Sequence, residues 1–515
     1  MSGFAGYTNY KHIYKENETT LKDMLRTIKH RGPDGKSEYN DSSVHIGVCH
    51  NNYGALISSH TMKIAHYVVA FDGILYNEEP LWNTLSETQL ISQEKSIEAL
   101  IINLYAQLGD NFVQHLNGLF ALVIYNINDG SFFGARDRFG GKPLYYTSVG
   151  GDFVFASEIK AILQYPEYKP TVNETALKEY MSLGHHWCNE TMFSKIFSVP
   201  PAHTMTYKNN QLRISRYWQP SYSTDDSKDI ISTAGEFNTY LADAVKTTLP
   251  DSGNYGNILT NDIYSSYIAA LSDADEGYSV YGDFDKHSSK EYASTLCNTL
   301  KLDNFTINIS TGEYIESLSD IVYYLDEPIF NPTEILSYFL YKGASQRTNI
   351  ALSCIGGAAL TQSKEIGPRL RHIEKELRIC DRLSMANSLE IRAPFLNNNF
   401  FDLACTIPDV YYTNTTKKGI ITGKNVLHQA ASKRLPTYFT EQIGPTRAIP
   451  LAVWLRNEKY YKLVKTALSS SAASRYLDQP RLLKALDAHK KYKADNSTYL
   501  WRAYTFVVWY EKFFN

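Results

Sequence analysis

The pattern of apolar residues changes partway along the chain, and this change constrains the fold more than any other sequence feature. Up to about residue 165, short β-branched and aromatic runs predominate. From about residue 232, helix-like stretches alternate with short apolar runs, a pattern typical of a parallel sheet covered by helices. After Pro368 the spacing is largely helical. We therefore predict an α/β protein with two domains, residues 1–218 and residues 219–515.

Individual elements can be placed within each part. In the first part we predict strands at 67–71, 119–125, 131–135 and 153–156, helices at 21–29 and 95–108, and a tight turn at 150–152. Residues 177–218 are predicted to be a connecting segment. In the second part we predict strands at 257–259, 278–281 and 305–309, separated by helices at 265–271 and 291–300.

The bulk composition excludes several classes of protein. The 515 residues include 51 Lys and Arg against 54 Asp and Glu, a net charge of −3 that argues against coating nucleic acid or an anionic membrane. No apolar run approaches the roughly 18 residues of a membrane helix, and the first residues do not resemble a signal peptide. The six cysteines are isolated, which favours a reducing compartment. We therefore expect a cytoplasmic protein with no nucleic-acid and no membrane partner.

A series of short motifs occurs in order along almost the whole chain. The first part contains HRGPDG at 30–35, DGILYN at 72–77, LNGLFA at 116–121, ARDRFG at 135–140, KPLYY at 142–146 and ASEIKA at 156–161. The second part contains DEP at 326–328, DRLSMA at 381–386 and EIRAPFL at 390–396. In this combination the motifs resemble the glutamine-hydrolysing asparagine synthetase family.

The resemblance implies a concrete fold and reaction. Residues 1–218 would form a class II glutamine amidotransferase domain of the αββα N-terminal-nucleophile type, which releases ammonia from glutamine. Residues 219–515 would form a parallel-sheet domain of the ATP-pyrophosphatase (HUP-like) type, which adenylates aspartate with MgATP before ammonia displaces AMP. By the same resemblance, subunits would pair through their glutaminase-type domains.

The residues with which the family hydrolyses glutamine are replaced in this chain. The nucleophilic cysteine corresponds to Ser2, whose hydroxyl is a poorer nucleophile than a thiol. The oxyanion position at Asp72 and Gly73 has an aspartate instead of an asparagine donor, and an ionised carboxylate cannot donate a hydrogen bond. The resemblance places the glutamine clamp at three positions that have lost the family's charged side chains, namely Cys49, Ile74 and Ser96.

The two loops that would bind MgATP are altered as well. The family's Ser-Gly-Gly-x-Asp-Ser-Ser loop, whose glycines let backbone N–H groups approach phosphate, corresponds to residues 260–266. Asp262 adds a negative charge there, and Tyr264 replaces a carboxylate expected near the metal. The second loop, at 353–359, has lost three carboxylates, and Gly444 aligns near a family lysine. The predicted ATP-loop positions, all degenerate, are Thr260, Asn261, Asp262, Tyr264, Ser265, Ser266, Ser353, Gly356 and Gly357.

Three interpretations are open. The first is a pseudoenzyme that needs no cofactor and acts by binding, as a homo-oligomer or together with an active family member. We favour it because the replacements fall on catalytic positions while turn glycines and core segments are kept. The second is a divergent but active glutamine-dependent asparagine synthetase, which would use MgATP. The third is a repurposed enzyme, such as an ATP-dependent ligase, in the same clefts.

A search for replacement chemistry finds no local signature. The histidines, including the adjacent pair His185 and His186, have no metal-ligand spacing, so we predict no metal site. The Ser-Ser pair at 265–266 is typical of a helix cap. Neither a glycine-rich nucleotide motif nor a local nucleophile motif is present.

Overall fold

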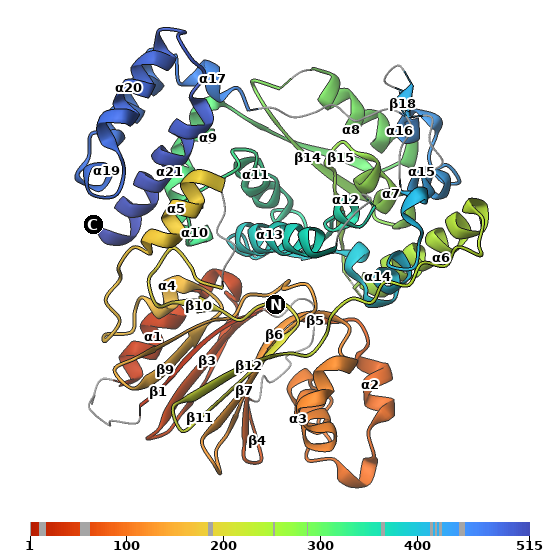
Figure 1. Cartoon of the computed structure of the whole chain (residues 1–515). Helices are drawn as coiled ribbons and strands as arrows, with labels where there is room; N and C mark the ends of the chain where they lie inside the picture. Colours follow the sequence, from red (N-terminus) through yellow and green to blue (C-terminus); the bar gives the residue numbers. More distant parts are fainter. Residues whose placement is uncertain are drawn as a thin grey trace.

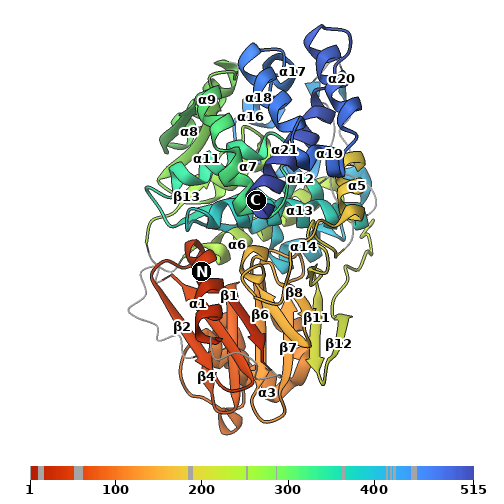
Figure 2. The same ribbon diagram turned by 90° about the vertical axis from the view of Figure 1, so that its left-hand side faces the viewer.

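The computed structural model describes residues 2–9, 17–51, 62–183, 189–250, 253–285, 287–361, 366–412, 416–417, 420–421, 425–441 and 449–515. Cys188, His185, His186 and Gly444 lie outside the described residues. The two antiparallel sheets of the first part lie at one end of the molecule, and the parallel sheet and most of the helices lie at the other (Figures 1 and 2). The predicted α/β class is therefore confirmed.

Two antiparallel sheets form the first domain. Their strand orders are β10-β8-β9-β1-β3-β2 and β12-β11-β7-β6-β5-β4. The strands are β1 (Ser2–Thr8), β2 (Gly35–Asn40), β3 (Val44–His50), β4 (Lys63–Ile64), β5 (Tyr67–Leu75), β6 (Gly118–Asn126), β7 (Ser131–Arg136), β8 (Tyr145–Val149), β9 (Asp152–Ala156), β10 (Phe197–Ser198), β11 (His203–Lys208) and β12 (Gln211–Arg216).

Side-chain alternation along these strands produces an αββα arrangement. Phe4 and Val48 pack between the two sheets, while their neighbours Ala5 and Cys49 pack on the outer side of the first sheet. This outer side is covered by α1 (Asn17–Thr27) and α4 (Ile159–Ile162). The second sheet is covered by α3 (Ile97–Leu108), on which α2 (Glu78–Thr84) packs (Figure 1). The N-terminal-nucleophile fold expected from the resemblance is thus present.

The segment 177–218 is more than the connection that we predicted. Its β11 and β12 extend the second sheet, and α5 (Glu174–Leu183), at its start, packs against α21 (Ser497–Phe514). The pattern was missed because β12 is mostly exposed and has few apolar residues to mark a strand. The predicted turn at 150–152 is confirmed, since Gly150 and Gly151 both have positive φ and join β8 to β9.

A five-stranded parallel sheet forms the second domain, in the order β15-β14-β13-β16-β17. The strands are β13 (Gly256–Ile258), β14 (Glu276–Gly282), β15 (Asp303–Ile309), β16 (Ile350–Leu352) and β17 (Glu390–Arg392). The three predicted strands and the parallel sheet are confirmed. The strand β17 lies after Pro368, where we predicted mainly helices.

Helices account for most of the second domain. They are α6 (Ile230–Thr248), α7 (Ile263–Leu271), α8 (His287–Leu300), α9 (Thr311–Glu316), α10 (Leu318–Leu325), α11 (Glu334–Ala344), α12 (Gly357–Leu360), α13 (Ile366–Met385), α14 (Asn398–Ala404), α15 (Val426–Ala431), α16 (Thr437–Glu441), α17 (Leu451–Trp454), α18 (Glu458–Leu468), α19 (Ser471–Tyr476), α20 (Gln479–Lys490) and α21. A two-stranded ribbon, β18 (Thr416–Lys417) and β19 (Ile420–Ile421), completes it.

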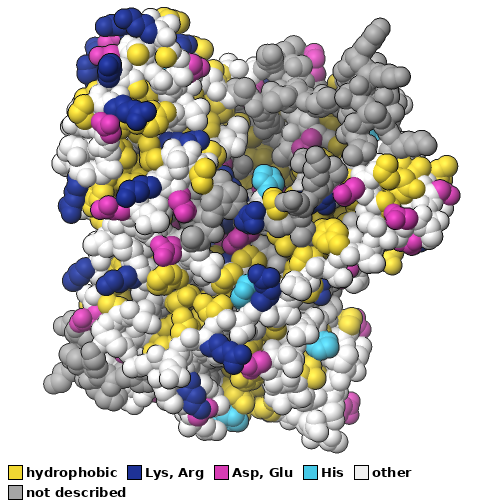
Figure 3. Space-filling model, viewed as in Figure 1, with side chains coloured by type: hydrophobic (Ala, Val, Ile, Leu, Met, Phe, Trp, Pro, Cys, Tyr) yellow, Lys and Arg dark blue, Asp and Glu magenta, His cyan; other side chains and the backbone are white. Residues whose placement is uncertain are grey.

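The described helices include none that is both long and apolar enough to cross a membrane. On the face shown in Figure 3, acidic and basic side chains are interspersed over both domains. This distribution agrees with the small net charge of the sequence.

Candidate functional sites

The parallel sheet defines one candidate site by its topology. The chain runs from β13 outward to β14 and β15, and then returns to β16 on the other side of β13. Ligands of such sheets bind at this reversal, beyond the carboxyl ends of the two diverging strands. Residues 260–266 follow β13 and residues 353–357 follow β16, and the Thr260 hydroxyl lies 3.4 Å from the Cys354 sulfur. The structure therefore brings together the two loops that the sequence analysis selected.

The beginning of α7 is occupied by a side chain of the protein itself. Asp262 is the N-cap residue, and its carboxylate accepts hydrogen bonds from the Ser265 backbone N–H at 2.8 Å and from the Thr260 hydroxyl at 2.7 Å. Asn261 precedes it in a left-handed conformation with φ of 61°. Backbone N–H groups at a helix start are the usual donors to phosphate. Here one of them is already satisfied by a fixed negative charge.

The Tyr264 ring of the first loop packs against the second loop. It lies against Gly357, where even an added Cβ would come within 2.9 Å of the ring, and it contacts Phe395 edge to face. Its hydroxyl lies 2.8 Å from the Thr361 hydroxyl. Burial raises the pKa of Tyr264, so the phenol stays protonated and cannot act as an anionic metal ligand.

The two serines of the first loop have structural partners. The Ser265 hydroxyl accepts from the Thr260 backbone N–H at 3.1 Å, and the Ser266 hydroxyl donates to the Asp262 carbonyl at 2.7 Å. The Tyr292 hydroxyl lies 3.0 Å from Ser266. The expected cap is thus formed by Asp262 and not by the Ser-Ser pair.

The second loop is held by backbone contacts. Ser353 donates to the Arg392 carbonyl through both its N–H and its hydroxyl, at 2.8 and 3.2 Å. Gly356 has φ of 87°, and Gly357 donates its N–H to the Cys354 carbonyl. Among the described residues there is no group of three or more His, Cys, Asp or Glu side chains that could hold a metal ion.

The second candidate site lies around Ser2 in the first domain. The Ser2 hydroxyl donates to the Phe71 carbonyl at 2.6 Å, and its backbone N–H donates to Asp72 at 3.3 Å. Asp72 is fully buried and pairs with Arg31 at 2.8 Å. The negative charge that we expected to repel an oxyanion is therefore neutralised by an arginine. Gly73 has φ of 144°, and a Cβ there would lie 2.2 Å from the Leu119 carbonyl oxygen.

Of the three predicted clamp positions, the structure places Cys49 away from Ser2. Cys49 lies on the opposite face of the first sheet, where its sulfur faces the Leu25 carbonyl of α1 at 3.6 Å. Ser96 is the N-cap of α3 and accepts from the Ala99 backbone N–H. Ile74 follows Gly73 in β5 and is half-buried. Successive side chains of a strand point to opposite faces of the sheet, so an alignment that is shifted by one residue selects a residue on the wrong face. This explains why Cys49 was misplaced.

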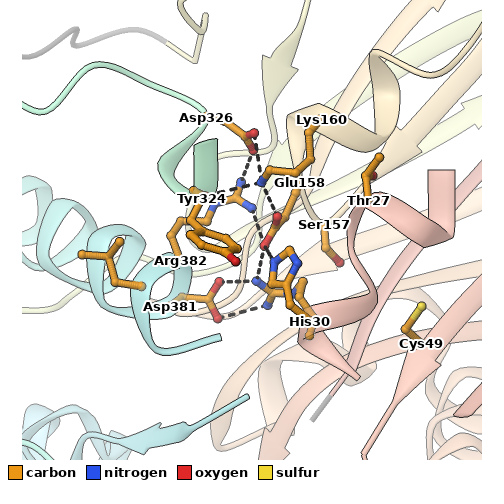
Figure 4. Close-up of polar contacts among 12 residues, drawn as sticks. Thr27, His30, Cys49, Ser157, Glu158, Lys160, Tyr324, Asp326, Asp381 and Arg382 are labelled. Carbon is orange, nitrogen blue, oxygen red and sulfur yellow. Dashed lines mark hydrogen bonds and ion pairs between the residues drawn. The ribbon is translucent and has the colours of Figure 1, made fainter. Parts of the chain in front are cut away.

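A buried ionic cluster, of which the sequence analysis selected only Asp72 as a site residue, joins this site to the second domain. Arg31 contacts Asp381 at 2.8 and 3.1 Å and Glu158 at 3.0 Å. Figure 4 shows side chains from both domains converging here, with Cys49 apart from them. The cluster has four cations and four carboxylates, namely Arg31, Lys142, Lys160, Arg382, Asp72, Glu158, Asp326 and Asp381.

Ionisation in this cluster is maintained by opposite charges. Burial works against the charge of Asp381, but Arg31 and Lys142 hold its pKa at about 2. Burial likewise opposes the charge of Glu158, whose pKa is lowered well below its ordinary value by Lys160, His30 and Arg382. Asp381 and Glu158 are therefore charged near neutral pH, and the ion pairs of the cluster connect the two domains.

Comparisons with known proteins agree with this architecture. A glutamine amidotransferase domain model matches residues 1–218, and the asparagine synthase model matches residues 236–372 and 370–511, which is more than half of the chain. The chain belongs to the asparagine synthase family.

Curated members of the asparagine synthase family match over long stretches. Asparagine synthetase [glutamine-hydrolyzing] 1 of Bacillus subtilis (strain 168) is 24% identical over 623 aligned residues, which cover 99% of this chain and 96% of the relative. Asparagine synthetase [glutamine-hydrolyzing] 3 of the same organism is 32% identical over 278 residues, covering 53% of this chain and 45% of the relative. A putative asparagine synthetase [glutamine-hydrolyzing] 2 of Methanocaldococcus jannaschii is 25% identical over 460 residues, covering 82% and 88%.

The cluster residues all lie within the motifs by which the sequence resembles the asparagine synthase family. Arg31 belongs to the segment 30–35, Lys142 to 142–146, and Asp381 to 381–386. The motifs themselves were therefore the signal available in the sequence. No local pattern indicates that these three segments meet, because Arg31 and Asp381 are 350 residues apart.

Proposed function

We propose that this member of the asparagine synthase family is a pseudoenzyme, without glutaminase or ATP-dependent synthetase activity, that acts by binding another protein. The observation that carries the proposal is the Asp262 carboxylate on the N-terminus of α7. A phosphate oxygen at about 4 Å from this carboxylate would be repelled by about 4 kcal/mol at an effective dielectric constant of ~20.

Two further observations support the loss of synthetase chemistry. Tyr264 of the first loop packs against Gly357 of the second loop, so a bulky ring stands where a carboxylate was expected near the metal. Carboxylates that would ligand Mg²⁺ are replaced in the second loop by Ile355, Ala358 and Ala359. A phosphate ligand at this loop would also lie beside the acidic side chain of Asp262.

The glutaminase site supports the same conclusion. The Ser2 hydroxyl is committed to the Phe71 carbonyl, and the Asp72 carboxylate is committed to Arg31. Loss of a single oxyanion donor typically lowers the rate of acyl transfer by roughly 10²–10³. Here the donor and the thiol nucleophile are both absent, so we expect no measurable hydrolysis of glutamine.

The partner is proposed to be a second copy of this chain or an active family member, in the cytoplasm. Both domains keep their folds, so the surfaces by which family members associate can persist without catalysis. Co-purification from the native cell, followed by mass spectrometry and light scattering, tests this. Recovery of the chain only as an isolated monomer would contradict the binding role.

The test of catalysis uses the full chain with the Bacillus subtilis relative as a positive control. We expect no thermal stabilisation by MgATP, no pyrophosphate release with aspartate and ammonia, and no ammonia release from glutamine. The variant Ser2→Cys is expected to stay inactive, because a thiol alone does not supply the oxyanion donor. Pyrophosphate release would instead establish a divergent synthetase, and glutamine hydrolysis abolished by Ser2→Ala would establish a working glutaminase.

A further inference from the structure

A cleft on the outer side of the first domain lies between α1 and the loop that leads into β2. Its volume is about 320 Å³, at the lower end of the range for small-molecule sites. We call it the α1–β2 cleft. The apolar floor includes Leu25 and Cys49, and one wall is formed by Gly32, Pro33 and Gly35. The cleft is on the opposite face of the sheet from Ser2, so it is separate from both candidate sites.

Four cationic side chains line the α1–β2 cleft, and none of the described lining residues is acidic. Lys22, Arg26 and Lys29 are spaced by four and three residues, so they form a stripe along one side of α1 and its continuation. Lys36 faces them from β2. The cleft therefore places positive charges on two opposing sides of a small concave space.

For two of these cations, the intramolecular partners compete weakly with a ligand. Arg26 pairs with Asp23 and Lys36 pairs with Glu38, but both cations are exposed, and exposed pairs contribute little to stability. Lys29 makes no ion pair with any other residue in the described part of the chain. A multiply charged anion could engage several of these cations at once.

The base of the cleft is closely packed. A Cβ at Gly32 would lie 2.3 Å from the His50 backbone nitrogen, and one at Gly35 would lie 2.4 Å from the His50 ring. The loop is therefore pressed directly onto β3. Burial raises the pKa of the Cys49 thiol to about 12; the charges of Lys36 and Lys29 act in the opposite direction, and that of Glu38 acts in the same direction as burial.

We propose that the α1–β2 cleft binds a small polyvalent oxyanion, of the di- or tricarboxylate or the pyrophosphate type. A row of three cations opposite a single lysine matches an anion whose charges are distributed over both ends. Charge-assisted hydrogen bonds to such groups are about twice as strong as neutral ones. The site does not depend on the proposed loss of catalysis, because no residue of the two candidate sites lines it.

The experiment is calorimetric titration of the full chain with sodium citrate, with sodium pyrophosphate and with sodium acetate, in about 0.15 M salt to screen diffuse attraction. We expect citrate or pyrophosphate to bind and acetate not to bind. The double variant Lys29→Gln/Lys36→Gln should weaken binding about tenfold or more. The matched control is Lys208→Gln, an exposed lysine in β11, which should leave the affinity unchanged.

Hydrogen exchange then locates the bound anion. We expect protection of the amides at 22–36 and 44–50. Binding of citrate alone would assign the carboxylate type, and binding of pyrophosphate alone the phosphate type. Absence of binding by both anions would overturn the proposal, as would an affinity unaffected by the double variant. Protection at 259–266 in place of 22–36 would also overturn it.

Discussion

The buried ionic cluster makes a quantitative prediction about how the two domains are held together. Asp381 on α13 contacts Arg31 at 2.8 and 3.1 Å and Lys142 at 2.9 Å. The substitution Asp381→Asn leaves four cations against three carboxylates, and its amide oxygen can replace only about one of the three contacts. Two lost charged hydrogen bonds at about 1.5 kcal/mol each give ~3 kcal/mol. This agrees with the about 3–5 kcal/mol expected when a buried charge is left unbalanced.

The loss should depend on pH in a defined direction. Because the pKa of Asp381 is lowered to about 2 in the folded chain, its stabilising effect is complete above about pH 4. The effect is lost as the pH falls through about 2. Urea unfolding followed by tryptophan fluorescence at pH 7 should therefore show the full destabilisation of Asp381→Asn. We further expect the transitions of the two domains to separate, because the contacts of Asp381 are with the first domain.

A second substitution distinguishes charge balance from simple loss of contacts. In Asp381→Asn/Lys142→Met the cluster again has equal numbers of cations and carboxylates. We expect the double variant to be more stable than the sum of the single effects predicts, by about 1–3 kcal/mol. Strict additivity within about 0.5 kcal/mol, or no effect of Asp381→Asn, would refute the reasoning. Asp129→Asn, which removes an exposed pair with Lys208, is the control and should have no measurable effect.

Three further substitutions test other parts of the structure. Burial raises the pKa of Glu334 to about 7, so its contribution to stability is complete below about pH 4.5 and is lost as the pH rises through 7. In urea unfolding at pH 8, the variant Glu334→Gln should therefore be more stable than wild type by up to ~3 kcal/mol. At pH 5 the difference in stability should be much smaller. Asp262→Ala should cost about 1 kcal/mol through loss of the α7 cap and still show no thermal shift with MgATP. Gly73→Ala should lower the free energy of unfolding by about 1–3 kcal/mol or more, measured by thermal unfolding, because the added Cβ would clash with the Leu119 carbonyl. Gly130→Ala, where the space around the glycine is open, should lower it less.

Much of the fold could be predicted from local patterns. The parallel strands at 257–259, 278–281 and 305–309 are short apolar runs between helical segments, and the turn at 150–152 depends on two adjacent glycines. The hairpin of β11 and β12 escaped prediction because β12, an exposed edge strand, lacks an apolar signature. The side-chain face of Cys49 also escaped, because strand register is set by pairing with β1 and not by the residue itself.

The candidate sites, too, could be predicted from the sequence only in part. The sequence by itself determined the family resemblance and the positions at which reactive or charged side chains were exchanged, such as Ser2 and Tyr264, since these depend only on order along the chain. Only the tertiary structure decided what the exchanged residues do. Asp72 is neutralised by Arg31, which is held in turn by Asp381 from the other domain. The physical reason is that electrostatic partners are chosen by distance in the folded molecule, and these partners lie far apart in the sequence.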